Sequence, residues 1–465
     1  MPCDRDATAR WLERRLPRAA RRVAMLGDPP PGAADALVAR GAVVERLEAT
    51  ASAASAEPPG TAEVLVATAS RAADVAATVA RASRLLAPRG RLLLLLPAGA
   101  DTEPPGRLVR GLLEAGFAPR AEPEELGEGC RGVVADFDGY TVRPYRPGDE
   151  DAILALFRRS FHVERDRAHW AWKYAANPHG AHRISLARDP GGELVGQYCA
   201  YPVRLLQDGR EQTVHQVGDI MTAASARGVG RGPTSVFART ARHFYETFCR
   251  GQVRFNYGFN TGAHQKLSIR LVGAHQVEEA PLRVRELGRR PARVRRRLLG
   301  GCRIAPDPGP DELDRLWREA RAAYGSLVVR DARHLRWRYL DRPDQRYLLL
   351  GARRRRRLVA WAVFARRGAD LVWGDALALP AQVGCLEDLV ADAVRRLADG
   401  PALERVVGWF PPRPDWLDRC LTELGFELRP EPQQLALMVV PFDDPDAAER
   451  CARDFHYTYG DSDLF

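Results

Sequence analysis

The residues best suited to hold a ligand lie in the run Arg227-Gly228-Val229-Gly230-Arg231-Gly232, where glycines alternate with arginines and valine. Glycine lets the backbone approach a phosphate and turn its N–H groups toward it. The run follows a strand-like segment, residues 217–222, and precedes a helix with Pro233 in its first turn and an apolar stripe of Val236, Phe237, Phe244 and Phe248. Because a helix N-terminus favours negative charge, we predict a pyrophosphate site here. On spacing alone, a flexible surface loop is the alternative.

Composition indicates a globular chain of several domains. Its 465 residues are 45% hydrophobic and 8% aromatic, enough for real cores. The net charge of +10 is typical of nucleic-acid binding, but only Lys173 and Lys266 are lysines and the other basic residues are arginines. That bias suggests a GC-rich coding sequence, so we expect no nucleic-acid partner. The run Arg353–Arg357 lies between two strand-like segments and is predicted to be a hairpin turn.

Cysteine usage and hydropathy bear on the compartment. None of the eight cysteines has a partner at metal-ligand spacing, so we expect no metal. The first residues lack the apolar stretch of a secretion signal, and the longest apolar run, residues 92–97, is too short to span a bilayer. These features predict a soluble cytoplasmic protein with reduced thiols and no membrane contact.

Strand-like and helix-like segments alternate from Arg22 to about Phe137, within a first domain predicted over residues 1–137. Such alternation predicts an open parallel sheet with helices on its faces. From Ala62 onward the pattern, with "ARASRLLAPRGRLLLLLPAG", resembles the second half of a class I S-adenosylmethionine methyltransferase. Where that family has a glycine-rich cofactor loop, this chain has "MLGDPPPG" at residues 25–32, and its prolines remove N–H donors. We therefore expect a degenerate Rossmann-like domain used for interaction or scaffolding.

A second pattern begins near Gly139. A strand, a helix begun by Asp149, and the paired strands 184–187 and 194–201 precede the glycine run, and strand 255–259 follows it. This order resembles the GNAT acyltransferase superfamily. The segment "GDIMTAASARGVGRG" is similar to that family's coenzyme A segment, with Arg227, Gly230 and Gly232 at the positions of its Arg/Gln-x-x-Gly-x-Gly pattern. The resemblance covers about residues 139–273 and implies a GNAT domain over 138–290.

The resemblance also implies roles for individual residues. Acetyl-CoA or another acyl-CoA would be the co-substrate, with Met221 and Thr222 contacting its pantetheine and thioester and residues 227–232 its pyrophosphate. Asp219 is either the catalytic base or a structural hydrogen-bonding group. The family's tyrosine acid would fall near Leu267 or Ser268, so Tyr257, Ser268 or water must return the proton. Asn260 is expected to cap the next helix rather than contact substrate.

An internal repeat extends the resemblance to the C-terminal part. His169, Trp172, Lys173, Tyr174 and Pro178 recur in register as His334, Trp337, Arg338, Tyr339 and Pro343. The repeat predicts a second GNAT-like domain over residues 291–465. Its counterpart of the phosphate run, "LPAQVGCLED", lacks the arginine and paired glycines, so we expect one acyl-CoA site per chain. His169, Trp172 and Tyr174 either line an acceptor cleft or belong to the core.

The C-terminal run "HYTYGDSDLF" is either a frayed tail or a segment folded back near the acceptor site. The second interpretation rests on a loose resemblance to the ending of some tandem GNAT-like proteins of polysaccharide and natural-product biosynthesis. It would bring Asp461 and Asp463 to the acceptor.

The predicted fold is therefore α/β, with a Rossmann-like sheet followed by two GNAT-like domains. The predicted function is acyl-CoA-dependent N-acyltransfer, by direct attack of a small-molecule or peptide amine, in a bacterial polysaccharide or natural-product pathway. An acyl carrier protein is an alternative donor, since its acidic surface suits an arginine-rich exterior. A non-catalytic acyl-CoA-binding or assembly module and an S-adenosylmethionine-dependent methyltransferase are the alternative functions.

Overall fold

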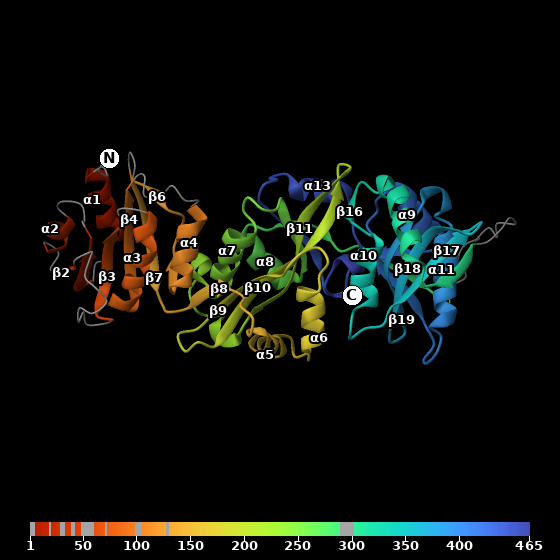
Figure 1. Cartoon of the computed structure of the whole chain (residues 1–465), viewed down its shortest axis with the longest axis horizontal. Coiled ribbons are helices and arrows are strands. Elements are labelled where there is room, and N and C mark those ends of the chain that lie inside the picture. The colour runs from red at the N-terminus through yellow and green to blue at the C-terminus, as the bar shows by residue number, and fades with distance from the viewer. Residues whose placement is uncertain are drawn as a thin grey trace. The chain divides into compact units, whose positions relative to one another are not determined.

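The computed structural model describes residues 5–17, 20–27, 33–38, 42–47, 60–69, 72–97, 105–126, 130–288 and 302–465 (Figure 1). The chain forms two compact units. The first comprises Met1–Val163, Ile184–Tyr198 and Ile220–Phe248, and the second comprises Glu164–Arg183, Cys199–Asp219 and Cys249–Phe465. Strands β10 (Leu194–Gln207) and β11 (Arg210–Thr222) contribute residues to both units.

The first unit begins with a sheet in the strand order β2-β1-β3-β4-β7-β5. The strands β1 (Arg22–Leu26), β2 (Val43–Leu47), β3 (Ala62–Thr68) and β4 (Leu86–Pro97) are parallel, as the sequence predicts. Strands β5 (Phe117–Pro119), β6 (Glu124–Glu125) and β7 (Cys130–Phe137) were not expected, and β7 is antiparallel to β4. The proline-rich turn at residues 28–32 lies outside the described residues.

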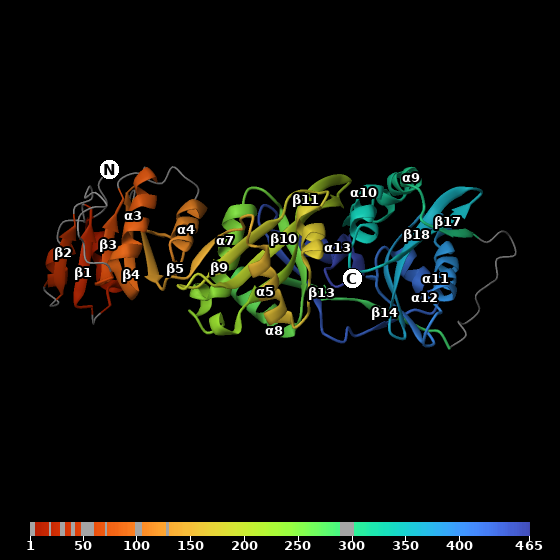
Figure 2. The same cartoon turned by 60° about the horizontal axis from the view of Figure 1, so that its bottom comes forward.

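Hydrophobic residues cover both faces of this sheet. Because successive side chains of a strand point to opposite faces, Leu92, Leu94 and Leu96 join one core cluster, and Leu93 and Leu95 join another. The helices of this part are α1 (Arg5–Arg15), α2 (Ala33–Val38), α3 (Ala72–Leu85) and α4 (Pro105–Glu114), and Figure 2 shows α3 and α4 beside the strands.

The remainder of the first unit leads to the glycine run. It contains β8 (Thr141–Pro144), α5 (Glu150–Phe161), β9 (Arg183–Arg188) and α7 (Val236–Phe248), and β9 pairs with β8 and β10. Helix α5 begins after Asp149 as predicted, but this side chain makes no cap bond. Its carboxylate instead binds Arg143 and Arg188, each at 2.7 Å.

The second unit contains two sheets. The first has the order β13-β22-β12-β11-β10-β16-β23, and the second β15-β17-β18-β19-β20-β14-β21. The first sheet contains β12 (Phe255–Asn260), β13 (His275–Glu279), β16 (Ser326–Val328), β22 (Ala436–Pro441) and β23 (Phe455–His456), besides parts of β10 and β11. The second contains β14 (Leu282–Glu286), β15 (Arg303–Pro306), β17 (Leu348–Arg354), β18 (Arg357–Arg367), β19 (Asp370–Ala378), β20 (Arg405–Trp409) and β21 (Glu427–Arg429).

These two sheets exchange strands. Strand β14 pairs with β20, which is more than a hundred residues later, while the late strand β22 pairs with β12. Parallel pairs occur in both sheets, between β11 and β12 and between β19 and β20. The domain boundaries given by the sequence stay predictions, because sheet membership here does not follow chain order. Helices α8 (Gly262–Val272), α9 (Pro310–Ala320), α11 (Cys385–Arg396), α12 (Asp415–Glu423) and α13 (Ala447–Asp454) complete the unit.

The two copies of the sequence repeat have the same local structure. Each is a short helix, α6 (Arg167–Trp170) or α10 (Ala332–Leu335), continued by a π-helical turn. The copies contact each other reciprocally: the Trp172 indole N–H donates to the Trp337 carbonyl at 2.5 Å, and the Trp337 N–H donates to the Trp172 carbonyl at 2.9 Å. Because the two copies are alike, each residue of one copy can be compared with its counterpart in the other.

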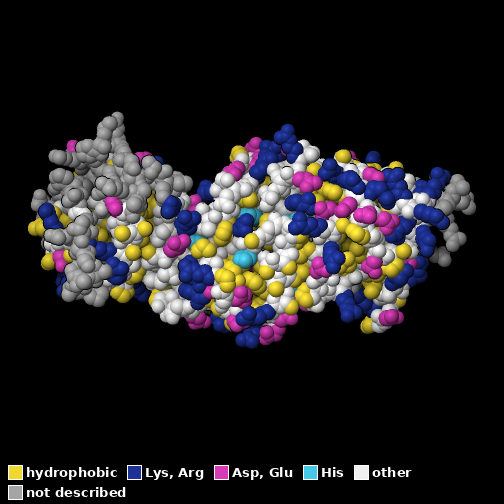
Figure 3. Space-filling view, in the orientation of Figure 1, with side chains coloured by type: hydrophobic (Ala, Val, Ile, Leu, Met, Phe, Trp, Pro, Cys, Tyr) yellow, Lys and Arg dark blue, Asp and Glu magenta, His cyan; other side chains and the backbone are white. Residues whose placement is uncertain are grey.

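Surface features agree in part with the sequence. Residues Arg355 and Arg356 both have positive φ and join β17 to β18, which confirms the predicted hairpin turn. Basic and acidic side chains are interspersed over the face drawn in Figure 3. Within the described part of the chain, no helix is long and apolar enough to cross a membrane.

Candidate functional site

The glycine run is an exposed loop between β11 and α7. Gly230 has φ +69°, and a Cβ there would overlap the Thr234 carbonyl oxygen, so only glycine fits. Gly228 differs, because an added Cβ would meet no atom within 4 Å. Pro233 lies in a separate 3₁₀ turn, Gly232–Thr234, and α7 begins only at Val236, so its predicted place in the first turn of that helix is wrong.

The loop offers free donors to an anion. Among the residues that the structure describes, the N–H groups of Gly228 and Gly230 find no acceptor, while Arg231 donates its N–H to Thr234 Oγ1 at 3.0 Å. Arg227 is exposed and steadied by a bond from its Nε to the Thr222 carbonyl, 3.1 Å. Exposed N–H groups in a loop that also carries Arg227 and Arg231 suit a phosphate. Before the loop, Met221 is buried and Thr222 is half-buried at the end of β11.

Asp219, also on β11, is surrounded by donors. It has φ +47°, and its Oδ2 accepts from Arg165 at 2.7 Å, Lys173 at 2.8 Å and the Tyr174 hydroxyl at 2.6 Å. Burial alone would raise the pKa of Asp219, but the charges of Lys173 and Arg165 hold it far below its ordinary value. A carboxylate in this state stays ionised and is a poor proton acceptor. The geometry favours the structural alternative for Asp219, and its catalytic role stays a prediction.

The second copy repeats this arrangement. Asp375 accepts from Arg330 at 2.9 Å and from the Tyr339 hydroxyl at 2.8 Å, and Arg330 also binds Asp461 at 2.6 Å. Since this copy lacks the glycine loop, an Arg–Tyr–Asp cluster shared by both copies is best explained as structure. The copies differ at Lys173, whose counterpart is Arg338.

The C-terminal tail is packed against both clusters and is not frayed. Asp461 is 3% exposed beside Arg330. Asp463 accepts the Asp219 N–H at 3.3 Å and lies 3.5 Å from Lys173 Nζ. A Cβ at Gly218 would overlap Asp463 Oδ2, so glycine is what lets the tail come this close. The tail thus folds back as one of the sequence alternatives has it, while contact with an acceptor stays a prediction.

A small cavity adjoins this cluster within the second unit. It has a volume of about 10 Å³, room for about one water molecule. Its lining includes His169, Trp172, Lys173, Arg338, Arg342 and Asp463. Burial lowers the pKa of His169 to about 4, so this ring is neutral at neutral pH. Arg338 Nη1 is buried with no hydrogen-bond partner among the described residues, and Asp463 is the carboxylate among the lining residues.

The other residues expected at the site lie in packed surroundings. Tyr257 is 1% exposed and its hydroxyl donates to Gln216 at 3.3 Å, while Ser268 is 3% exposed. Asn260 donates to Ser268 Oγ at 3.1 Å and does not cap the next helix, because the N-cap of α8 is Thr261. The expectation that Asn260 caps this helix is wrong.

The structure therefore brings Asp219, Tyr174 and Asp463 into one cluster and places His169 and Trp172 at the adjoining cavity. Sequence reasoning did not give a role to Lys173. The sequence does single this residue out, since it is one of only two lysines and its counterpart in the second repeat copy is an arginine.

The expectation of reduced thiols is also wrong in part. Cys302 and Cys385 form a disulfide, and Cys130 is disulfide-bonded as well. Cys199, Cys249, Cys420 and Cys451 are buried and are not disulfide-bonded.

Comparison with known proteins gives a match to a family model. Residues 141–258 match the family model described as "Acetyltransferase (GNAT) domain". No curated protein sequence matches the chain. Similar solved structures include a probable N-acyltransferase of unknown function from Enterococcus faecalis V583, with 12% identity, coverage of 65% of this chain and 72% of that one, and a TM-score of 0.49.

Two others are GCN5-related N-acetyltransferases. The structure from Kribbella flavida has 16% identity, 66% and 72% coverage and a TM-score of 0.47. The structure from Anabaena variabilis has 13% identity, 64% and 72% coverage and a TM-score of 0.48. On the family match, residues 141–258 are similar to a GNAT acetyltransferase domain.

Proposed function

We propose that the protein is an acyl-CoA-dependent N-acyltransferase. The observation that carries the proposal is that the segment matched as a GNAT domain contains the exposed loop of residues 227–232, with two arginines and with glycine N–H groups that no described residue accepts. In the proposal these groups hold the pyrophosphate of acetyl-CoA or another acyl-CoA. Met221 and Thr222, on β11, contact the pantetheine arm and thioester through their backbone.

The reaction needs a group that removes a proton from the acceptor ammonium. Of the carboxylates in the cluster, Asp219 is saturated by three donors, whereas Asp463 lines the cavity with its side chain 17% exposed. We assign the proton acceptor to Asp463. The cations Lys173, Arg338 and Arg342 disfavour an ammonium beside them, which lowers the pKa of a bound amine.

In the proposed reaction the proton of the ammonium passes to Asp463 and then to solvent. The free amine attacks the thioester carbonyl, the carbon–sulfur bond breaks, and coenzyme A leaves as a thiolate that takes up a proton. The cavity holds about one water-sized group, which matches the head of a primary amine rather than a whole acceptor. The acceptor is accordingly proposed to be a small-molecule or peptide amine, reached through its amine end.

Apart from the residues that line the cavity, the rest of the chain is proposed to be architectural. The reciprocal contacts of the repeats and the parallel pairs in both sheets support a second GNAT-like domain without a donor loop. The order β2-β1-β3-β4, with antiparallel β7 beside β4, supports a Rossmann-like, methyltransferase-like first domain. We propose scaffolding or interaction for that domain.

Mass spectrometry of reaction mixtures tests the function. The purified chain should transfer an acetyl group from acetyl-CoA to at least one amine in a panel of amino acids, amino sugars, peptides and polyamines. Acetyl-CoA binding without transfer would favour the alternative, a non-catalytic acyl-CoA-binding module. Methylation of any substrate with S-adenosylmethionine would contradict the proposal.

A further inference from the structure

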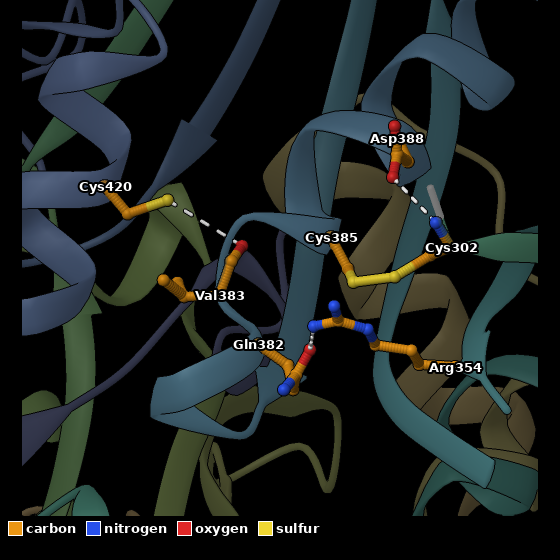
Figure 4. Close-up of a disulfide and its surroundings, with 7 residues drawn as sticks. All are labelled: Cys302, Arg354, Gln382, Val383, Cys385, Asp388 and Cys420. Atoms are coloured by element: carbon orange, nitrogen blue, oxygen red, sulfur yellow. Dashed lines mark hydrogen bonds between the residues drawn. A yellow bond between two sulfur atoms is a disulfide. The ribbon is translucent and has the colours of Figure 1, made fainter. Parts of the chain in front are cut away.

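A disulfide and a carboxylate converge at the start of α11, as Figure 4 shows. Cys302 lies just before strand β15, and Cys385 is the first residue of α11. Asp388 follows one helical turn later and accepts the Cys302 N–H at 3.3 Å. One ligand atom from each of the three residues lies within 4.8 Å of the others. The packing of α11 against the sheet of β15, β17 and β18 fixes these positions.

The location favours reactive thiols. Cys385 opens a helix of 12 residues, and the positive end of a helix dipole stabilises negative charge near it. Cys302 and Asp388 are only half-buried, so solutes can reach them. Helix α11 follows the segment that stands where the first copy has its glycine loop. The second copy thus has thiol chemistry at the position where the first has phosphate-binding glycines.

We propose that Cys302, Cys385 and Asp388 form a redox-controlled site for a thiophilic divalent cation of the zinc class. The disulfide is its oxidised, metal-free state. A dithiol reductant supplies two electrons and two protons, which convert the disulfide to two thiols. Binding of the cation then releases the two thiol protons and forms two metal–sulfur bonds and one metal–oxygen bond, and water fills the fourth position.

The chemistry of the donor set selects the metal. Thiolates are soft ligands that prefer zinc over magnesium or calcium, and two thiolates with one carboxylate suit a tetrahedral ion with one open position. Arg354 lies near the disulfide in Figure 4, where it donates to Gln382 Oε1 at 2.8 Å. Its positive charge offsets the single negative charge that two thiolates and one carboxylate leave on a site with a divalent cation. Cys420 is nearby but its Sγ contacts the Val383 carbonyl, so it is not one of the three ligands.

Cobalt(II) is the probe that tests this site. The full chain, reduced under anaerobic conditions with a phosphine and freed of it, is titrated with Co²⁺ while its absorption spectrum is recorded. We expect a thiolate-to-cobalt charge-transfer band that saturates at one Co²⁺ per chain, disappears on oxidation to the disulfide, and is displaced by Zn²⁺. Absence of the band in the reduced wild type would overturn the proposal.

Variants assign the ligands. Cys302→Ser and Cys385→Ser should each lose roughly half of the charge-transfer intensity, because one of two thiolates is gone. Asp388→Asn should keep the band and bind Co²⁺ at least tenfold more weakly, and Cys420→Ser is the matched control that should change nothing. An undiminished band in Cys385→Ser would overturn the proposal.

Alkylation of the reduced wild type tests the same ligands without any variant. Zn²⁺ should protect Cys302 and Cys385 from an alkylating reagent, with the modified positions read by mass spectrometry. Equal alkylation of both cysteines with and without Zn²⁺ would contradict the site.

Discussion

Replacing Gly228 by aspartate tests the phosphate loop at the glycine that can change without disturbing the loop. An added Cβ at this position meets no atom within 4 Å, the residue is exposed, and its φ is not positive. Alanine at position 228 should therefore be tolerated. The same experiment at Gly230 is uninformative, because positive φ and overlap with Thr234 make any side chain disruptive there.

The expected magnitude follows from Coulomb's law at an exposed site. One aspartate charge about 4 Å from each of two phosphate charges costs ~1 kcal/mol per pair in water, or ~2 kcal/mol together. This corresponds to a Kd for acetyl-CoA raised about 30-fold in Gly228→Asp and unchanged in Gly228→Ala. Because exposed charges are screened, the difference between the variants should shrink at high salt.

Isothermal titration calorimetry of the wild type and both variants at two salt concentrations measures these values. Equal Kd values for the aspartate and alanine variants would refute the placement of the pyrophosphate at this loop. Equal melting temperatures of the two variants are the control for folding.

Three further predictions concern stability and proton transfer. Asp463→Asn should lower kcat about 10²- to 10⁴-fold and leave acetyl-CoA binding intact, and its rate should recover as pH rises toward the acceptor amine's pKa; a fully active variant contradicts the assignment. Cys385→Ser opens a loop between residues 83 apart, so the free energy of unfolding should fall by about 4 to 5 kcal/mol in urea titrations, and an unchanged midpoint would argue against a stabilising disulfide. Burial raises the pKa of Asp461 to about 6; the charge of Arg330 lowers this pKa, and the charge of Asp375 raises it further. The folded state then holds a proton that the unfolded state has lost, so this group should cost up to ~3 kcal/mol of stability as pH rises from about 4 through 6, a dependence that Asp461→Asn should lack.

Local patterns predicted much of the fold. The buried strand at residues 92–96, the Arg355-Arg356 turn and the repeat at His169 and His334 depend on neighbours in sequence, and the structure has each of them. The sequence could not predict that β14 and β22 exchange sheets, because the residue pattern of a strand does not specify which strand it pairs with.

The site was less predictable because its contacts join distant residues. Asp219 meets Asp463 across 244 positions, and Cys302 meets Cys385 across 83. No spacing rule connects such pairs. The saturation of Asp219 likewise depends on Arg165 and Lys173, which lie about fifty residues earlier in the chain, before and within the first repeat copy. Residue types therefore predict a phosphate-binding loop, which stays a prediction, but they do not predict the state of Asp219 and Asp463.

Binding of an acyl-CoA donor is the property on which the proposed function depends. Calorimetric titration of the purified wild type with acetyl-CoA and, separately, with S-adenosylmethionine tests it most directly. Saturable binding of acetyl-CoA at one site per chain, with no heat from S-adenosylmethionine, is the predicted result. Binding of S-adenosylmethionine with no binding of acetyl-CoA would contradict the proposed function and move the chemistry to the N-terminal sheet.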